Sequence, residues 1–200
     1  EELELPEYVR SAGPDPSNDP DNAWKESWRL LEDMYLSDKY PLASIGVSNF
    51  HLTDIEHLDN FARIHPHVLQ VNIWSLLFDV NLVEYCHKHR IHVQVYNAIQ
   101  GTVMNPEVAP RAFHRIQKVA YEIGDELGTT VTPAQVILAW LIQHGVSVIP
   151  RTSRLARLEE NSAVAIMNIP AMNDTQVETV AHTVESYLSG DDLEQDIHVS

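Results

Sequence analysis

The chain has 200 residues, 44% of them hydrophobic, and its 29 acidic side chains against 13 Lys and Arg give a formal net charge of −16. This composition is typical of a globular protein with a hydrophobic core, and the negative charge argues against nucleic acid or an anionic membrane as a partner. A single cysteine, Cys86, excludes an internal disulfide framework, and no run of about 18 apolar residues predicts a membrane span. We therefore expect a cytoplasmic protein whose partners are small molecules or other proteins.

Both ends of the chain differ in composition from its middle. Residues 1–22 hold seven acidic side chains, one Arg and the prolines of the stretch SAGPDPSNDPDN, which predicts an acidic, Pro-rich extension. Residues 189–200 are again acidic and poor in apolar side chains, which predicts an acidic tail. The folded domain is therefore expected over residues 23–188.

Helical and strand patterns alternate along residues 23–188. Apolar residues at helical spacing from Trp24 to Tyr35 predict a first helix over residues 23–37. A strand followed by a helix is then expected three times, with strands at 42–47, 68–73 and 91–96 and helices at 52–62, 82–88 and 112–127. A helix over 132–144, opened by Thr132 and Pro133, precedes a fourth strand at 146–149 and a short helix that contains Leu155, Leu158 and Asn161.

Alternating strands and helices predict parallel βα units and an α/β fold. A doubly wound sheet usually carries a Gly-rich phosphate turn after its first strand, but the chain has seven glycines and no G-x-G-x-x-G. We therefore favour a parallel (β/α) barrel of the TIM type. A complete barrel takes about 250 residues, so about four βα units predict a partial barrel that is truncated at its N-terminal side.

Polar side chains lie at or near the ends of the predicted strands: Ser48 and Asn49, Gln70 and Asn72, Tyr96 and Asn97, and Arg151, Thr152, Ser153 and Arg154. Active sites of βα barrels lie at the carboxyl ends of the strands, which makes these residues the candidate site. Amide and hydroxyl groups suit a ligand part with both donors and acceptors, such as a carboxamide, and Tyr96 offers a face for a flat ring. The alternative for any one of them is that it satisfies backbone groups of its own loop.

Three of the nine arginines, Arg151, Arg154 and Arg157, cluster around the predicted start of a helix. Guanidinium groups beside free helical N–H groups are typical of a phosphate site. The alternative is that these arginines form ion pairs with Glu159 and Glu160 on a solvated helix. The acidic composition of the rest of the chain favours the phosphate site.

Histidines gather near Cys86, at positions 87, 89 and 92, but residues two apart on a helix point to different faces. No metal site is predicted, because no His-x-x-x-His motif is present. Cys86 is expected to be a small buried apolar side chain rather than a nucleophile. The sequence Asn173-Asp174-Thr175 matches a glycosylation signal and is interpreted as a chance match.

Several motifs occur in an order that resembles the second half of the aldo-keto reductase barrel over residues 24–188: IGVSNF (45–50), QVN (70–72), VY (95–96), TPAQV (132–136), LIQHGV (141–146), VIPRT (148–152) and RLEEN (157–161). The resemblance implies an NADP(H)-dependent oxidoreductase that transfers a hydride between a carbonyl and an alcohol. It implies that Ser48, Asn49 and Gln70 hold the nicotinamide carboxamide, and that Tyr96 stacks on the nicotinamide ring. Asn97, the neighbouring cofactor-binding candidate, stands where the family usually has Ser. The resemblance further implies contacts to the 2′-phosphate and to the adenine, from Arg151, Thr152 and Arg157 and from Glu160 and Asn161 respectively.

The sequence also departs from the family. Arg151 stands where Lys is usual, and Asn72-Ile73-Trp74-Ser75 replaces Glu-Tyr-His-Pro in one wall of the substrate pocket. The family's catalytic Asp, Tyr, Lys and His lie in the first half of the barrel, and no region of this sequence matches them. Tyr8, Lys25 and Lys39 stand in none of the corresponding contexts.

Two other classes of function stay open. A non-redox enzyme such as an isomerase, cyclase or dehydratase would use the same scaffold with His51, Asp79 or Tyr96 as its acid or base. A catalytically inactive regulatory or assembly subunit would keep the scaffold without the chemistry. A partial barrel also has two open sheet edges, which predicts that a second copy or a partner chain covers them.

Overall fold

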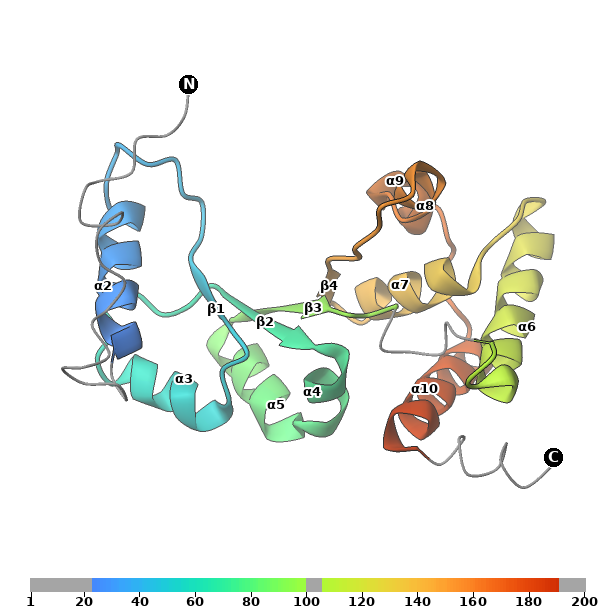
Figure 1. Ribbon diagram of the computed structural model, residues 1–200, viewed down its shortest axis with the longest axis horizontal. Coiled ribbons are helices and arrows are strands. Elements are labelled where there is room, and N and C mark those ends of the chain that lie inside the picture. The colour runs from blue at the N-terminus through green and yellow to red at the C-terminus, as the bar shows by residue number, and fades with distance from the viewer. Residues whose placement is uncertain (1–22, 100–105, 191–200) are drawn as a thin grey trace. The chain divides into compact units, whose positions relative to one another are not determined.

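The structure, a computed structural model, describes residues 23–99 and 106–190 (Figure 1). The predicted extension at 1–22 and residues 191–200 of the predicted tail lie outside these ranges. The chain forms two compact units, Glu1–Leu69 (unit 1) and Gln70–Ser200 (unit 2).

Unit 1 contains helix α2 (Ala23–Tyr35), strand β1 (Gly46–Ser48) and helix α3 (Leu52–Asp59). Its core is formed by buried apolar side chains, those of Trp28, Ile45 and Leu58. Trp24 meets the rings of Phe50 and Phe61 edge to face, at centroid distances of 5.5 and 5.8 Å. The apolar side of the predicted first helix therefore faces this core, as its spacing requires.

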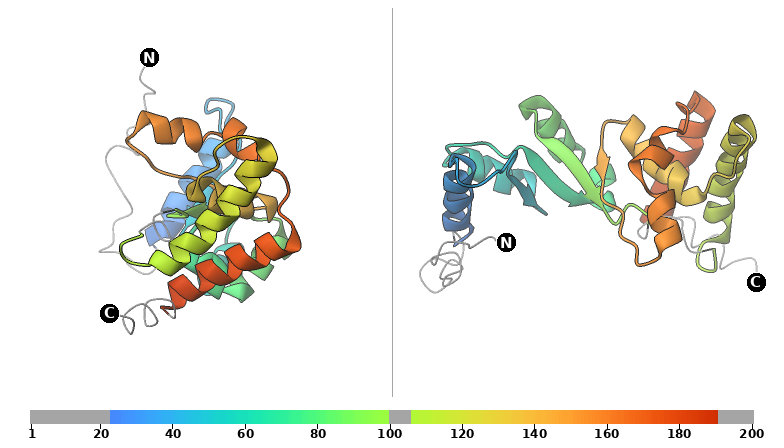
Figure 2. Two further views of the ribbon diagram at one scale, coloured as in Figure 1. Left: turned by 90° about the vertical axis from the view of Figure 1, so that its right-hand side faces the viewer. Right: turned by 90° about the horizontal axis from the view of Figure 1, so that it is seen from above.

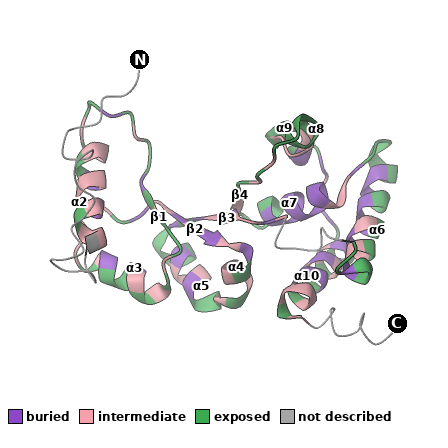
Figure 3. Cartoon of the chain, in the orientation of Figure 1, coloured by how far each residue is buried: buried purple, intermediate pink, exposed green. Residues whose placement is uncertain are grey.

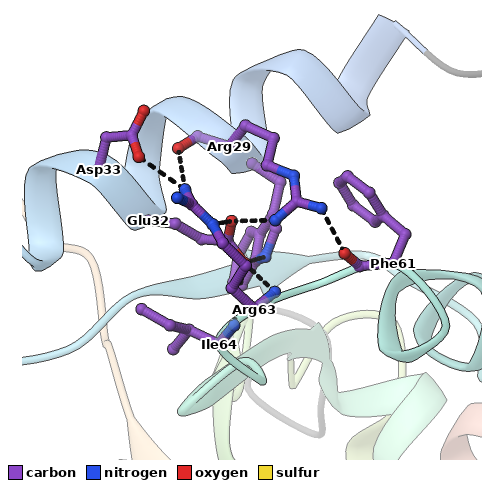
Figure 4. A network of polar contacts seen from close by, with 7 residues as sticks. Arg29, Glu32, Asp33, Phe61, Arg63 and Ile64 are labelled. Carbon is purple, nitrogen blue, oxygen red and sulfur yellow. Dashed lines mark hydrogen bonds and ion pairs between the residues drawn. The ribbon is translucent and has the colours of Figure 1, made fainter.

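A buried carboxylate joins α2 to the segment that follows α3 (Figure 4). Glu32 has no exposed surface. Its oxygens accept hydrogen bonds from Trp28 Nε1 (3.1 Å), Arg29 Nη1 (2.9 Å), Arg63 Nε (2.8 Å) and the backbone N–H groups of Arg63 (2.6 Å) and Ile64 (2.9 Å). Burial acts to raise the pKa of Glu32, but the hydrogen bonds, that from the Arg63 side chain first, outweigh it and lower the pKa from 4.5 to about 2. Glu32 is therefore ionised in the folded unit.

Strand β1 is shorter than the strand predicted at 42–47. It begins at Gly46 and ends at Ser48. Ile45 precedes it and is already held by His67, whose N–H donates to the Ile45 carbonyl (2.9 Å) and whose Nδ1 accepts from the Ile45 N–H (3.2 Å). Gly46 passes so close to Val68 that a Cβ atom would collide with the Val68 carbonyl oxygen. The apolar run therefore serves mainly for packing, and only its end belongs to the strand.

Strands β2 (Val68–Asn72), β3 (His92–Tyr96) and β4 (Ser147–Val148) complete a four-stranded sheet in the order β1-β2-β3-β4. Strands β3 and β4 run parallel, with Gln94 opposite Ser147 and Val95 opposite Val148. Every second residue of β2 and β3 is buried, namely Leu69, Val71, Val93 and Val95. The opposite face of these two strands carries Gln70, Asn72, Gln94 and Tyr96. The parallel α/β sheet of four strands confirms the predicted fold class.

The helices of unit 2 are α4 (Ile73–Phe78), α5 (Val80–His89), α6 (Pro110–Leu127), α7 (Pro133–Gln143), α8 (Leu155–Glu160), α9 (Ala163–Met167) and α10 (Asp174–Ser189). Helices α6, α7 and α10 pack together, and Figure 2 shows α6 and α10 side by side. Helix α7 is buried along its whole middle, from Ala134 to Leu141, and is purple there in Figure 3. No helix in residues 23–99 and 106–190 combines the length and the apolar character needed to cross a membrane.

Helices α4, α9 and α10 were not among the predicted elements. Helix α4 follows β2 without a break, because Asn72, the last residue of the strand, also caps the helix and accepts from the Trp74 N–H (3.1 Å). Helix α10 begins with a capping box in which Asn173 Oδ1 accepts from the Gln176 N–H (3.0 Å) and Gln176 Oε1 accepts from the Asn173 N–H (3.2 Å). The asparagine of the glycosylation-like sequence is therefore a helix cap.

Candidate functional site

Strands β1 and β3 are each followed by an asparagine in the same left-handed backbone conformation. Asn49 directly follows β1 and Asn97 directly follows β3, and both have a φ of 58°, in the left-handed region. Asparagine tolerates this region better than other side chains, because its short polar group bonds locally. Non-glycine residues held in this region gather at functional sites. The two polar pairs, Ser48-Asn49 and Tyr96-Asn97, therefore share a local backbone geometry that positions them at strand ends.

The predicted site residues divide between the two units. Ser48 and Asn49 are exposed residues of unit 1. The other predicted residues belong to unit 2, namely Gln70, Tyr96, Asn97, Arg151, Thr152, Arg157, Glu160 and Asn161. Within unit 2 they form an amide and aromatic group on β2 and β3 and an arginine group around α8.

Gln70 and Gln94 form a pair on the half-buried face of β2 and β3. Gln70 Nε2 donates to Gln94 Oε1 at 2.8 Å. The structure gives no hydrogen bond to Gln70 Oε1 or from Gln94 Nε2 within its described residues, so the pair keeps one free acceptor and one free donor. Tyr96 lies two residues beyond Gln94 and therefore on the same face. An acceptor, a donor and an aromatic ring on one face suit a flat ligand that carries an amide.

Sequence reasoning missed Gln94. The signal that could have found it is the period of two along β3, which places Gln94 on the face of Tyr96 and away from the buried Val93 and Val95. Gln94 lies inside the mostly apolar run predicted as a strand at 91–96 and is not among the predicted site residues.

The arginine group lies after β4 and around the short helix α8. Thr152 Oγ1 accepts from the Arg154 N–H at 3.1 Å, which turns the chain into α8. Arg151, Arg154 and Arg157 are all exposed. Their guanidinium groups form no ion pair or hydrogen bond with any described residue, so the alternative of pairing with Glu159 and Glu160 is not realised. Three positive charges without a partner among the described residues therefore lie within seven residues of a strongly acidic chain.

Asn161 at the end of α8 holds a buried acceptor without a donor. Its Oδ1 is covered and has no hydrogen-bond partner, a situation that costs free energy unless a ligand or water supplies the donor. The preceding carbonyl, that of Glu160, accepts from Gln135 Nε2 at 3.1 Å. This bond fixes the end of α8 to the first turn of the buried helix α7.

Of the remaining candidates, Asp79 and Cys86 have structural roles, and His51 lies at the start of α3. Asp79 Oδ1 caps α5 by accepting from the Leu82 N–H (3.2 Å), and the backbone N–H of His51 donates to Asp54 Oδ2 (2.8 Å) at the start of α3. Cys86 is fully buried, as predicted, and burial first and the charge of Asp79 second raise its pKa to about 11. Among residues 23–99 and 106–190, no three His, Cys, Asp or Glu side chains are grouped as metal ligands.

The sequence and the fold both match known proteins. The model of the Aldo/keto reductase family matches residues 7–184. An NAD(P)H-dependent D-xylose reductase of Aspergillus niger is 34% identical over 152 residues, covering 72% of this chain and 46% of the relative. A glyoxal reductase of Bacillus subtilis is 32% identical over 142 residues, covering 70% and 46%.

Solved structures of aldo-keto reductases also resemble this chain. An aldo-keto reductase of the silkworm Bombyx mori superposes with a TM-score of 0.60 at 27% identity, covering 80% of this chain and 47% of that one, and the same enzyme has been crystallised with NADPH. The chain spans about half the length of the curated relatives it matches, which are covered to 43–46%. The partial (β/α) barrel predicted from the sequence agrees with this coverage. The chain belongs to the aldo/keto reductase family.

Proposed function

We propose that the chain provides the cofactor-binding part of an NADP(H)-dependent aldo-keto reductase, which transfers a hydride between a carbonyl and an alcohol. The observation that carries this proposal is the group of unpaired arginines beside the orphaned acceptor of Asn161. Both features lie within unit 2 and within the same ten or so residues of sequence, and neither has a partner in the described chain.

The arginine group supports selection of a phosphate. A phosphate monoester carries up to two negative charges and three acceptor oxygens, and guanidinium groups bind it with two parallel hydrogen bonds. Arg151 and Arg157 are proposed to take the 2′-phosphate that distinguishes NADPH from NADH, with Thr152 beside them. Because the chain is otherwise acidic, a surface without this group would repel the cofactor.

The end of α8 supports recognition of the adenine. The Oδ1 of Asn161 needs an N–H donor, and an exocyclic amine of a purine is such a donor. Glu160 is half-buried next to it and is proposed to face the same base. The bond from Gln135 to the Glu160 carbonyl holds both residues in place before any ligand arrives.

The pair of Gln70 and Gln94 supports recognition of the nicotinamide. A carboxamide offers one carbonyl and one NH2 group, which complement the free donor of Gln94 and the free acceptor of Gln70. Tyr96 is proposed to cover the ring and Asn97 to lie beside it in unit 2, by analogy with the family. The same analogy proposes a nicotinamide contact for Ser48 and Asn49, which belong to unit 1. NADPH bound in this way supplies the hydride that reduces a carbonyl carbon.

Reduction of a carbonyl also needs a proton donor for the developing alkoxide. The family uses a tyrosine beside a lysine, in motifs that have no match here. Lys25 lies over the rings of Trp24 and Phe61, at 5.7 and 5.8 Å, and Lys39 over that of Tyr40, at 5.5 Å. The proposal therefore assigns cofactor binding to the described residues and proton donation to groups outside them.

The prediction of a partner that covers the sheet edges also becomes a proposal. Strands β1 and β4 are the two edges of the sheet, and open edges are typically covered by pairing or assembly. We assign this role to a second copy of the chain, so light scattering should give a dimeric mass, and a monomeric mass at all concentrations would refute it.

The phosphate assignment is tested by comparing NADPH and NADH binding to the Arg157→Gln variant of the full chain. We expect the affinity for NADPH to fall about tenfold or more and that for NADH to change little, because only NADPH carries the 2′-phosphate. Lys118→Gln is the matched control, since Lys118 is an exposed cation on α6 whose partner, Glu122, lies 4.0 Å away. Equal losses for both cofactors would refute the assignment of Arg157.

A further inference from the structure

A second concave site lies at the other end of the strands. A cavity of about 260 Å³ is lined by residues of unit 2 alone, namely Leu76, Val83, His87, Arg90, Ile91, His92, Val93, His144, Gly145 and Val146. All of them except Leu76 and Val83 lie in or beside the two turns that lead into β3 and β4, from α5 and from α7. Of the candidate cofactor site, Gln70 and Gln94 lie in the middle of β2 and β3, and Tyr96 and the arginine group lie at or beyond the carboxyl ends of the strands. None of these residues lines the cavity, which is therefore separate from that site.

The charged lining of the cavity is entirely basic. Its titratable residues are His87 on α5, Arg90 in the turn that follows, His92 at the start of β3 and His144 at the end of α7. No Asp or Glu lines the cavity, although acidic side chains outnumber Lys and Arg by 29 to 13 in the whole chain. The other lining residues from these elements are apolar or glycine.

Helix electrostatics explain only part of this arrangement. The carboxyl end of a helix is the negative end of its dipole and attracts basic side chains, which accounts for His87, Lys88 and His89 in the last turn of α5. His92 and His144 come from a strand and from a different helix. Their convergence with Arg90 on one cavity needs another reason.

The backbone at Arg90 points to a role for its side chain. Arg90 follows α5 with a φ of 59°, in the left-handed region that is unfavourable for most side chains. Glycine is the usual residue at such a helix end, and the corresponding turn after α7 has one, Gly145, at a φ of 78°. The Arg90 guanidinium makes no hydrogen bond or ion pair with any described residue, so nothing within this part of the chain accounts for an arginine there.

Hydrogen bonds hold two of the imidazoles at the cavity. His144 Nδ1 donates to the Trp140 carbonyl at 2.7 Å. His92 Nε2 lies 2.6 Å from Ser147 Oγ. Both rings are therefore fixed by the fold around the cavity that Arg90 also lines.

We propose that this cavity binds a small organic anion, with Arg90, His87 and His144 at its anionic group and the apolar residues Leu76, Val83 and Val93 around its body. The volume is at the small end for ligand sites, which span about 300–1,000 Å³, so the ligand is a compact carboxylate or phosphate monoester. This site is independent of NADP(H) binding.

The test is calorimetric titration of the full chain with benzoate and, separately, with phenyl phosphate, at pH 7. Benzoate is fully ionised at this pH and carries its charge on an apolar ring, as the proposed ligand does. The tighter of the two probes identifies the anionic group, and benzyl alcohol, the neutral control, is expected not to bind.

Variants locate the site. Arg90→Asn removes the guanidinium and keeps a residue that tolerates the left-handed turn, and we expect a loss of affinity of about tenfold or more. His144→Gln keeps a donor for the Trp140 carbonyl but changes the group that faces the ligand, and we expect a smaller loss of affinity than in Arg90→Asn. Lys88→Gln is the matched control, because Lys88 is exposed on α5 and does not line the cavity. Absence of binding by both probes, or equal losses in the Arg90→Asn and Lys88→Gln variants, would overturn the proposal.

Discussion

Replacing Glu32 with Gln tests the main polar contact of unit 1. The substitution keeps the shape of the side chain but removes its charge and one of its two acceptor oxygens, while Arg29, Arg63 and two backbone N–H groups still point at it. Lowering the pKa from 4.5 to about 2 corresponds to a stabilisation of about 3 kcal/mol above pH 4.5. Breaking a buried ion pair costs a similar amount, about 3–5 kcal/mol.

The expected effect depends on pH in a defined direction. A carboxyl whose pKa is lower in the folded state stabilises the fold above its unfolded pKa, and the stabilisation is lost as the pH falls through the folded pKa. The free energy of unfolding should therefore be about 3 kcal/mol lower for the Glu32→Gln variant than for the native chain at pH 7. This difference should shrink between pH 4.5 and pH 2.

The assay is urea unfolding followed by tryptophan fluorescence, because Trp28 itself bonds to Glu32 and Trp24 lies on the same helix. Asp33→Asn is the matched control. Asp33 contacts Arg63 at 2.6 Å, but 61% of its side chain is exposed, so its loss should cost less than about 1 kcal/mol. A Glu32→Gln variant that is as stable as the Asp33→Asn variant at pH 7 would refute the assigned role of the buried carboxylate.

Three further substitutions or reactions test other parts of unit 2. Asn173→Ala removes the capping box of α10 and should lower the free energy of unfolding by about 1 kcal/mol, with Asn173→Ser restoring most of it; thermal melts of both variants check this. Gly124→Ala would bring a Cβ within 2.7 Å of the Thr129 carbonyl oxygen and should cost about 1–3 kcal/mol by the same assay, and an unchanged melting temperature would contradict this reading. Cys86 should resist a thiol reagent at pH 8 in the native chain and react once urea unfolds it, because burial raises its pKa to about 11; rapid native labelling would contradict its placement.

Regular patterns made much of the fold predictable. The helices now seen as α2, α6 and α7 have long amphipathic or apolar patterns with recognisable ends, and each was expected within a few residues of its observed bounds. Strands β2 and β3 followed from runs of Val, Leu and Ile. Helix α4 was missed because its sequence, IWSLLF, continues the apolar run of β2, and no Gly or Pro separates the two elements. Helix α10 is not among the predicted elements, because Asn173 is interpreted there only as part of a chance match to a glycosylation signal and not as a helix cap.

The candidate site was predictable in its residue types but not in its pairing. Polar residues at strand ends and the arginine cluster could be read from order and spacing alone. Gln70 bonds to Gln94, and Arg157 has no partner among the described residues although Glu160 is three residues away. Both facts depend on side-chain placement, which periodicity does not encode. The orphaned Oδ1 of Asn161 likewise follows from packing around the end of α8.

The central claim is that this chain binds NADP(H) through its arginine group. The most direct measurement is a titration of the full 200-residue chain with NADPH and, in parallel, with NADH, followed by quenching of tryptophan fluorescence. We expect micromolar binding of NADPH, and an affinity for NADH that is weaker by about tenfold or more, because NADH lacks the 2′-phosphate. A folded chain that binds neither cofactor, or binds both equally, would contradict it and would favour a non-redox or regulatory role for the scaffold.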